Sequence, residues 1–235
     1  MKGVPSMLSI HNLSLSYGSR TLFDGVSAVI EPGRIVGLVA PNGYGKTTLL
    51  KAIAGMGGAR MRGVIDVDDV RPRDGSSLRA AAFYAPGDAS LLYPSLTAWD
   101  HLRMVQHLWP TRLNAEDVAR KCGIESFARK RVRSLSQGMK QQLSLAIAYL
   151  TDARYLLLDE PMNALDPTNV QLNSRILRGL ARRGKGIVMS SHILDNVDQI
   201  SDEVLFIYNQ RIVSGDLIPG ERAADRYRRL YSTGE

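Results

Sequence analysis

Residues Ala40–Leu50 read "APNGYGKTTLL", and this stretch indicates the fold of the chain. The apolar run "RIVGLVA" at Arg34–Ala40 predicts a strand, and the residues from Lys46 onward predict a helix that begins inside the loop. A strand, a glycine-rich loop and a helix in this order form the setting that binds nucleotide phosphates. The stretch therefore predicts an α/β fold with a phosphate-binding loop.

The residue types of the loop suit distinct parts of a nucleotide. Gly43 and Gly45 let the backbone curl so that successive N–H groups face the phosphates, and the helix N-terminus adds partial positive charge. Lys46 can reach the outer phosphates. The Thr47 hydroxyl suits a Mg²⁺ ligand, and Thr48 can donate to another phosphate oxygen. The loop thus predicts a magnesium–nucleotide site.

The loop departs from the usual pattern G-x-x-x-x-G-K-[ST] at its first position, where Ala40 stands. One methyl group causes little strain if the φ angle of Ala40 is negative. Tyr44 is bulkier than usual but still offers a backbone N–H. The alternative is a glycine-rich turn before an ordinary helix, and the rest of the chain decides between the two.

Composition limits the class of protein without choosing a function. The chain has 235 residues, of which 44% are hydrophobic and 23% charged, as in soluble globular proteins. The net charge of +7 suits an anionic partner, whether nucleotide, nucleic acid or membrane surface. No apolar run approaches the roughly 20 residues of a membrane span, and we expect no signal peptide. The single cysteine, Cys122, fits a reducing compartment.

Apolar patterning predicts the order of the elements. Strands are expected at Leu8–Leu15, Ser27–Ile30, Ile35–Val39, Ala81–Tyr84, Tyr155–Leu158, Gly186–Ser190 and Val204–Ile207. Helices are expected at Lys46–Ala54, Thr97–Leu108, Gln137–Leu150, Thr168–Ala181, Leu194–Gln199 and Glu221–Leu230. The strand–helix alternation of the second half predicts parallel strands. The early strands lack intervening helices and are expected to form an antiparallel sheet, and the largely helical middle is expected to be an insertion.

Four further segments support a nucleotide site. "YLLLDEP" places Asp159 and Glu160 after a buried strand, where one acid can hold Mg²⁺ and the next can polarise water; solvent-facing acids are the alternative. Ser136 is expected to cap the helix that follows it. Asp166 lies in "NALDP", and His192 follows another strand in "SSHILD". Each segment is weak singly, but their order along the chain is specific.

In this order of motifs the sequence resembles the nucleotide-binding subunit of ABC transporters over nearly its whole length. The resemblance implies an α/β P-loop NTPase cassette with a mixed/parallel core sheet, an N-terminal antiparallel β subdomain and a helical subdomain. It implies one ABC-type ATP-binding domain over residues 1–235. The nucleotide-binding core would comprise residues 1–87 and 152–235, and the helical signature subdomain residues 88–151.

The resemblance also implies residue roles. Tyr17 would stack on adenine, Asp166 would contact the second subunit, and "LSQGM" at Leu135–Met139 matches the family signature LSGGQ. Thr47 and Asp159 would coordinate Mg²⁺, while Glu160 and His192 would be catalytic. The residues implied to bind ATP are Tyr17, Asn42, Gly43, Tyr44, Gly45, Lys46, Thr47, Thr48, Ser136, Gly138 and Asp166.

Two departures from the family pattern stand out. The signature has Gln137 for a glycine and Met139 for glutamine, a form that looks like a variant of export-type subunits. Gly87 stands where the family has a glutamine that helps ligate Mg²⁺ and links the ATP site to the membrane partner. Asp88, the next residue, is a candidate substitute that would act through water. The coupling to a partner is therefore the least defined part of the resemblance.

By resemblance, we expect an ATPase that powers transport, in the direction of export. The family works as a head-to-tail pair, so the partners are a second copy or a homologous ATPase subunit, and a separate multi-spanning membrane protein. The helical middle, with "LLYPSLTAWDHLRMV", is expected to dock that protein at the cytoplasmic face of the membrane. The transported molecule is not specified by this chain.

Two other functions are alternatives to transport. A soluble ABC-type ATPase acting on nucleic acid or the ribosome fits the positive charge, but its relatives carry long coiled coils or two cassettes in one chain. An unrelated phosphate-loop kinase would lack the signature helix and the "DEP" spacing found here. Nucleic acid is therefore not expected as a partner.

Overall fold

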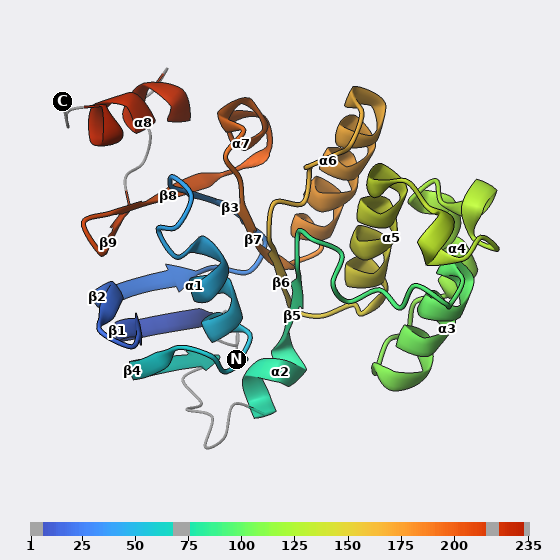
Figure 1. Cartoon of the computed structure of the whole chain (residues 1–235), viewed down its shortest axis with the longest axis horizontal. Coiled ribbons are helices and arrows are strands. Elements are labelled where there is room, and N and C mark those ends of the chain that lie inside the picture. Colours follow the sequence, from blue (N-terminus) through green and yellow to red (C-terminus); the bar gives the residue numbers. More distant parts are fainter. Residues whose placement is uncertain (1–6, 68–75, 215–220, 233–235) are drawn as a thin grey trace, which may run out of the picture.

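The computed structural model describes residues 7–67, 76–214 and 221–232, and Figure 1 shows its two sheets with the helices around them. The first sheet is antiparallel, in the order β2-β1-β4. Its strands are β1 (Leu8–Tyr17), β2 (Arg20–Ile30) and β4 (Arg60–Val67). This sheet forms one side of the molecule and packs toward the helix that follows the phosphate loop.

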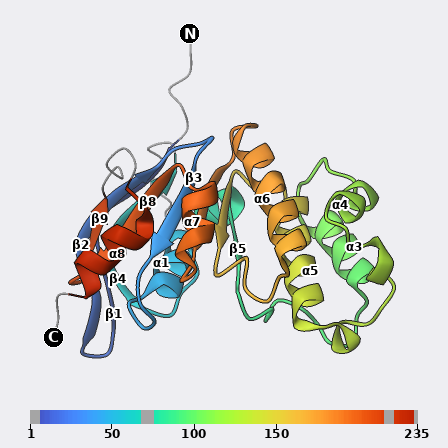
Figure 2. The same cartoon turned by 90° about the horizontal axis from the view of Figure 1, so that it is seen from above.

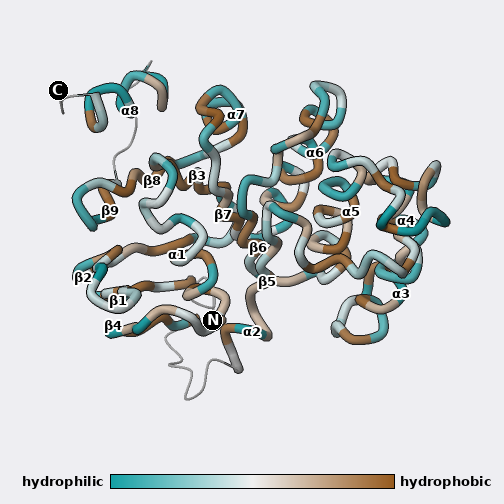
Figure 3. The backbone as a smooth tube through the Cα atoms, in the orientation of Figure 1, coloured by the Kyte–Doolittle hydropathy of each residue, from teal (hydrophilic) through white to brown (hydrophobic). Residues whose placement is uncertain are grey.

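The second sheet carries the functional loops. Its order is β5-β6-β7-β3-β8-β9, with all neighbours parallel except β8 and β9. The strands are β3 (Ile35–Val39), β5 (Ala82–Ala85), β6 (Tyr155–Leu158), β7 (Gly186–Ser190), β8 (Glu203–Tyr208) and β9 (Arg211–Ser214). Because β3, β6 and β7 are buried at every position, their sequences are continuous apolar runs. Figure 3 shows them as a hydrophobic centre with a more hydrophilic periphery.

Helices cover both faces of this second sheet. The helices of the described residues are α1 (Lys46–Ile53), α2 (Ser76–Ala81), α3 (Ala98–Leu108), α4 (Ala115–Lys121), α5 (Gln137–Leu150), α6 (Pro167–Ala181), α7 (Leu194–Ile200) and α8 (Ala223–Tyr231), with short 3₁₀ turns at Glu125–Phe127 and Val132–Ser134. Figures 1 and 2 show α3, α4 and α5 gathered at the end of the molecule away from the antiparallel sheet.

Alternate residues of each central strand pack into two separate hydrophobic cores, one on each face of the sheet. On β6, Leu157 packs with α1 and the antiparallel sheet, whereas Leu156 and Leu158 pack with the helices of the other face. This alternation is the period of two that a strand imposes. The side chain at the end of such a strand is therefore directed to a definite face of the sheet.

The sequence predictions of the elements were largely correct, with one error of topology. β1 and β2 pair in an antiparallel sheet, as expected. The early strand at Ile35–Val39 does not join them, since β3 lies between β7 and β8 in the parallel sheet. The expectation was wrong for this strand because β3 is buried on both faces, which fits a central parallel strand. Strands β4 and β9 and helices α2 and α4 were not predicted.

Within the described ranges, none of the helices has both the length and the apolar character needed to cross a membrane. The longest, α6, has 15 residues and carries polar side chains along its exposed face.

Candidate active site

The phosphate loop joins the end of β3 to the start of α1. Gly43 and Gly45 have φ angles of 82° and 97°, which favour glycine, and a Cβ on Gly45 would lie 2.9 Å from the Phe23 ring. Ala40 does not have a positive φ, so its methyl group causes no backbone strain. The N-terminus of α1 has no side-chain cap, which leaves its first N–H groups available to an anion.

Lys46 is buried at the N-terminus of α1. Its ammonium group donates to the carbonyl oxygen of Ala40 at 2.7 Å and lies 3.9 Å from Oε1 of Glu160. Burial lowers the pKa of Lys46, while the charges of Glu160 and Asp159 act in the opposite direction. A cation removed from water attracts an anion more strongly, so this group is placed to bind phosphate.

The carboxylate of Asp159 lies beside the loop. Thr47 donates its hydroxyl to Oδ2 of Asp159 at 2.6 Å, and Tyr84 donates to the same oxygen at 3.1 Å. Ser190 donates to Oδ1 at 2.5 Å. Burial, followed by the charge of Asp159, raises the pKa of Tyr84. A hydroxyl and a carboxylate oxygen at the edge of a phosphate loop are the ligand types that Mg²⁺ takes together with nucleotide phosphates.

Glu160 follows in an unusual backbone conformation. Its φ is 46°, which is uncommon for a residue with a side chain, and such strain clusters at functional sites. Oε2 of Glu160 lies 2.9 Å from Nδ1 of His192 and accepts the backbone N–H of His192 at 3.3 Å. The structure therefore joins Glu160 to both His192 and Lys46.

A cavity of about 710 Å³ opens over these groups. Tyr17 lies at its rim, and Thr47, Asp159 and Glu160 line its wall. The residues of the sequence prediction that line it are Tyr17, Asn42, Gly43, Gly45, Lys46, Thr47, Thr48, Asp159 and Glu160. The volume is in the range of small-molecule sites, and the chemistry of the wall suits a polyphosphate.

Other predicted residues lie outside this cavity. The ring of Tyr44 is turned away and packs edge-on against Tyr231 of α8 at 5.8 Å between centroids. Ser136 caps α5 by accepting the N–H of Met139, and Asp166 caps α6 by accepting the N–H of Asn169, a bond that lowers the pKa of Asp166. Like His192, these residues are not among the groups that line the cavity.

The start of the signature helix forms a surface of its own. A Cβ on Gly138 would lie 2.7 Å from the carbonyl oxygen of Ala164, so the first turn of α5 packs closely on the segment that leads to Asp166. Ser136 and Asp166 are both exposed beside this contact. One chain thus holds the predicted ATP-binding residues in two separate groups.

Several residues of the site were not found from the sequence. Arg20 donates to the carbonyl oxygen of Gly43 at 2.9 Å, and this bond stabilises the phosphate loop. Tyr84 and Ser190 contact Asp159, although no motif singled them out. Ser190 precedes the predicted histidine by two positions in "SSHILD", and this proximity was the available signal.

Gly87 has a structural reason to be glycine. A Cβ at this position would lie 2.6 Å from the carbonyl oxygen of Asp159 and 3.3 Å from Cβ of Glu160. The backbone of the two acids therefore occupies the space in which a glutamine side chain would begin. Asp88 lines the cavity, but its carboxylate accepts the N–H of Ser90 at 2.9 Å, and hydrogen bonds to Ser90 lower the pKa of Asp88.

We expect Gly87→Ala to lower the free energy of unfolding by about 1–3 kcal/mol, because overpacking forces the backbone apart. Gly179→Ala is the matched control, since Gly179 lies in α6 with nothing within 4 Å of the added Cβ. The control should be neutral or stabilising by up to about 1 kcal/mol, because alanine favours the helix. Urea unfolding of both variants measures the difference; equal stabilities would contradict the close packing at Gly87.

The phosphate loop, the neighbouring acids and the parallel sheet define a phosphate-loop nucleotide-binding protein. The family model described as "ABC transporter" matches residues 23–163. The chain belongs to the ABC transporter family, as one of its ATP-binding, ATP-hydrolysing subunits. The resemblance seen in the sequence and the expected fold class are thereby confirmed.

Named relatives agree with this assignment. The chain is 32% identical over 209 residues to the lantibiotic transport ATP-binding protein SrtF of Streptococcus pyogenes, covering 88% of this chain and 89% of the relative. It is 31% identical to the Nod factor export ATP-binding protein I of Paraburkholderia xenovorans, covering 85% and 67%. A solved structure titled as the ATP-binding subunit of an ABC transporter superposes with a TM-score of 0.81 at 27% identity, covering 97% and 95%.

Proposed function

We propose that this chain powers export of a substrate through a separate multi-spanning membrane protein, from the cytoplasmic face of the membrane. The observation that supports ATP hydrolysis as the energy source is the grouping of Lys46, Thr47, Asp159 and Glu160 around one cavity. The proposed direction of transport, export, rests on relatives named for lantibiotic transport and Nod factor export, and on the signature variant "LSQGM".

Within the cavity, the roles follow from the contacts. Lys46 and the loop N–H groups bind the phosphates, and Tyr17 at the rim stacks on adenine. Thr47 and Asp159 hold Mg²⁺, which when bound neutralises charge on the phosphates. Glu160 orients and deprotonates the attacking water, and His192 holds the Glu160 carboxylate in place.

The second group of residues requires a second subunit. Ser136 and Gly138 lie at the N-terminus of α5, a 14-residue helix whose end attracts anions, yet they do not line the cavity of their own chain. We propose that they contact the γ-phosphate held by another copy or a homologous subunit, with Asp166 at the same contact. ATP then favours the closed pair, and hydrolysis removes that preference.

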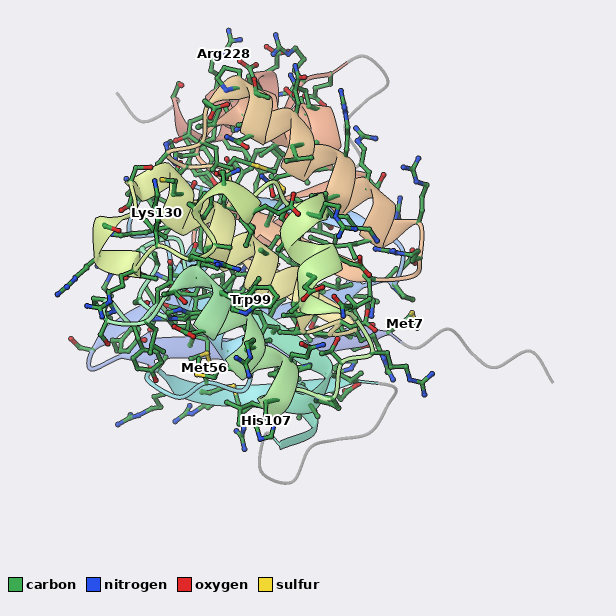
Figure 4. All side chains as sticks on the ribbon, turned by 90° about the vertical axis from the view of Figure 1, so that its right-hand side faces the viewer. Met7, Met56, Trp99, His107, Lys130 and Arg228 are labelled. Carbon is green, nitrogen blue, oxygen red and sulfur yellow. The ribbon has the colours of Figure 1, made fainter. Side chains whose placement is uncertain are left out.

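We further propose that residues 1–235 act as one ATP-binding domain. Residues 1–87 and 152–235 would form the nucleotide core, and residues 88–151 the helical signature subdomain. The helical end bears exposed apolar side chains, including Tyr93 and Leu108. Figure 4 looks onto this end, with Trp99, His107 and Lys130 labelled. We propose that the membrane partner docks here.

Co-purification tests the proposal. The tagged chain, extracted in mild detergent, should recover a multi-spanning membrane protein, and the complex should release free phosphate from ATP. Tyr93→Asp should reduce that recovery at least severalfold without changing ATP affinity. Met61→Asp, at another exposed apolar position, on β4, is the control and should leave recovery unchanged.

Three results would contradict the proposal. Recovery of ribosomes or nucleic acid, with an ATPase rate stimulated by RNA or DNA, would favour a soluble ATPase of the same family. A phosphorylated small molecule in place of free phosphate would indicate a kinase. Equal loss of the membrane protein in Tyr93→Asp and Met61→Asp would remove the docking assignment.

A further inference from the structure

Three neighbouring strands bring two hydroxyl groups to the carboxylate of Asp159. The parallel register pairs Tyr84 of β5 with Leu157 of β6, and Leu158 of β6 with Met189 of β7. Asp159 directly follows the end of β6, and Ser190 is the last residue of β7. Since side chains alternate between faces, Tyr84, Asp159 and Ser190 are all directed to the face that α1 covers.

The hydroxyls hold both oxygens of the carboxylate. Ser190 donates to Oδ1 of Asp159 at 2.5 Å, and Tyr84 donates to Oδ2 at 3.1 Å. Ser190 is completely buried and Tyr84 nearly so. Both hydroxyls belong to strands of the central sheet, so they hold the Asp159 carboxylate in a fixed orientation.

Ser190 also reaches the second acid. Its oxygen accepts the backbone N–H of Glu160 at 2.9 Å while its proton is donated to Asp159, so the hydroxyl acts as donor and acceptor at the same time. The accepted N–H belongs to the residue with the strained φ of 46°. This bond stabilises the backbone conformation that directs the Glu160 carboxylate toward His192 and Lys46.

We propose that Ser190 and Tyr84 are positioning residues of the ATPase site and that they differ in the groups they orient. Ser190 orients both the metal-binding Asp159 and the backbone of Glu160, whereas Tyr84 orients Asp159 alone. The proposal rests on the proposed function of this site. Hydrogen-bond partners of metal-binding side chains typically contribute 10- to 100-fold in metal affinity or activity.

The two variants should separate these roles. Tyr84→Phe should weaken the apparent Mg²⁺ affinity about tenfold, while kcat at saturating Mg²⁺ stays within about threefold of wild type. Ser190→Ala should weaken Mg²⁺ affinity similarly and also lower kcat at saturating Mg²⁺ by about tenfold or more, because Glu160 loses its backbone anchor. ATP affinity in EDTA should be unchanged in both variants.

Matched controls remove the same groups elsewhere. Tyr149→Phe deletes a buried phenol hydroxyl that donates to Asn173 at 2.9 Å, away from the site. Ser144→Ala deletes a buried hydroxyl that has no hydrogen-bond partner among the described residues. Both controls should keep wild-type Mg²⁺ dependence. Urea unfolding of all four variants checks that each is folded under the assay conditions.

Binding of Mn²⁺ with a non-hydrolysable ATP analogue, followed by electron paramagnetic resonance, gives a readout independent of turnover. We expect about tenfold weaker Mn²⁺ binding in Tyr84→Phe and Ser190→Ala. Wild-type Mn²⁺ affinity in both variants, or equal losses in the controls, would overturn the inference while leaving the proposed function intact. A wild-type chain that binds no Mn²⁺–nucleotide would overturn both.

Discussion

Glu160→Gln is expected to bind ATP with at least wild-type affinity and to hydrolyse it at least about 100-fold more slowly. An amide keeps the size of the side chain and can still accept from His192, but it cannot take a proton from water. It also removes a negative charge that lies 3.9 Å from Lys46, which favours phosphate binding. Phosphate release and a fluorescent nucleotide titration measure the two effects separately.

The control for this variant is Glu31→Gln, which neutralises an exposed glutamate paired with Arg34 at 3.5 Å. Its hydrolysis rate should equal that of the wild type. If Glu160→Gln hydrolysed ATP within about threefold of the wild-type rate, Glu160 would not be the base.

Lys46→Ala is expected to weaken ATP binding by about 100-fold or more. Truncating one partner of a buried charge pair typically costs about 2–5 kcal/mol, and about 2.8 kcal/mol corresponds to 100-fold. The loss is compounded because the carboxylate of Glu160 would then face the phosphates without its nearest ammonium group. Titration calorimetry with MgATP measures the affinity.

Lys185→Ala provides the comparison for Lys46→Ala. Lys185 is also largely buried and pairs with Asp152 at 2.7 Å, but it precedes β7 and lies at the opposite ends of the strands from the cavity. Its loss should leave ATP affinity unchanged. Unaltered affinity in Lys46→Ala would contradict the assignment of the phosphate loop.

The central elements were predictable from the sequence because burial leaves a clear pattern. The strands at Ile35–Val39, Tyr155–Leu158 and Gly186–Ser190 have the predicted bounds, since strands buried on both faces are unbroken apolar runs. The helix at Gln137–Leu150 was also predicted correctly, with Ser136 as its cap.

The missed elements lack such a pattern. In β4, the first four residues are all exposed, Arg60 and Arg62 among them, and Gly63 packs against the carbonyl oxygen of Asn12, so the strand is recognisable only from its pairing. Helix α4 has seven residues, mostly polar. The pairing of β4 depends on tertiary contacts that local sequence does not encode.

The same reason limited how many residues of the site could be predicted from the sequence. The phosphate loop and the two acids follow local motifs, so their residues were found. Tyr84 and Ser190 contact Asp159 through the register of strands that are far apart in the sequence. The close approach of Gly87 to Asp159 likewise appears only when β5 and β6 are placed side by side.

The central claim is that two subunits enclose ATP, with the start of α5 from one facing the phosphate loop of the other. Ser136→Asp tests it without unfolding the helix, because aspartate and asparagine cap helices as well as serine does. The added charge should repel the γ-phosphate across the interface, whereas Ser136→Asn supplies a neutral control of the same size.

Light scattering should be performed on the Glu160→Gln chain at saturating MgATP, alone and in the detergent-purified complex with its membrane partner. The account predicts a mass twice the 25.9 kDa of one chain for the isolated subunit, or two ATPase subunits in the complex. That pairing should persist with Ser136→Asn and be lost with Ser136→Asp. A single ATPase chain in both preparations, with ATP bound, would contradict the account.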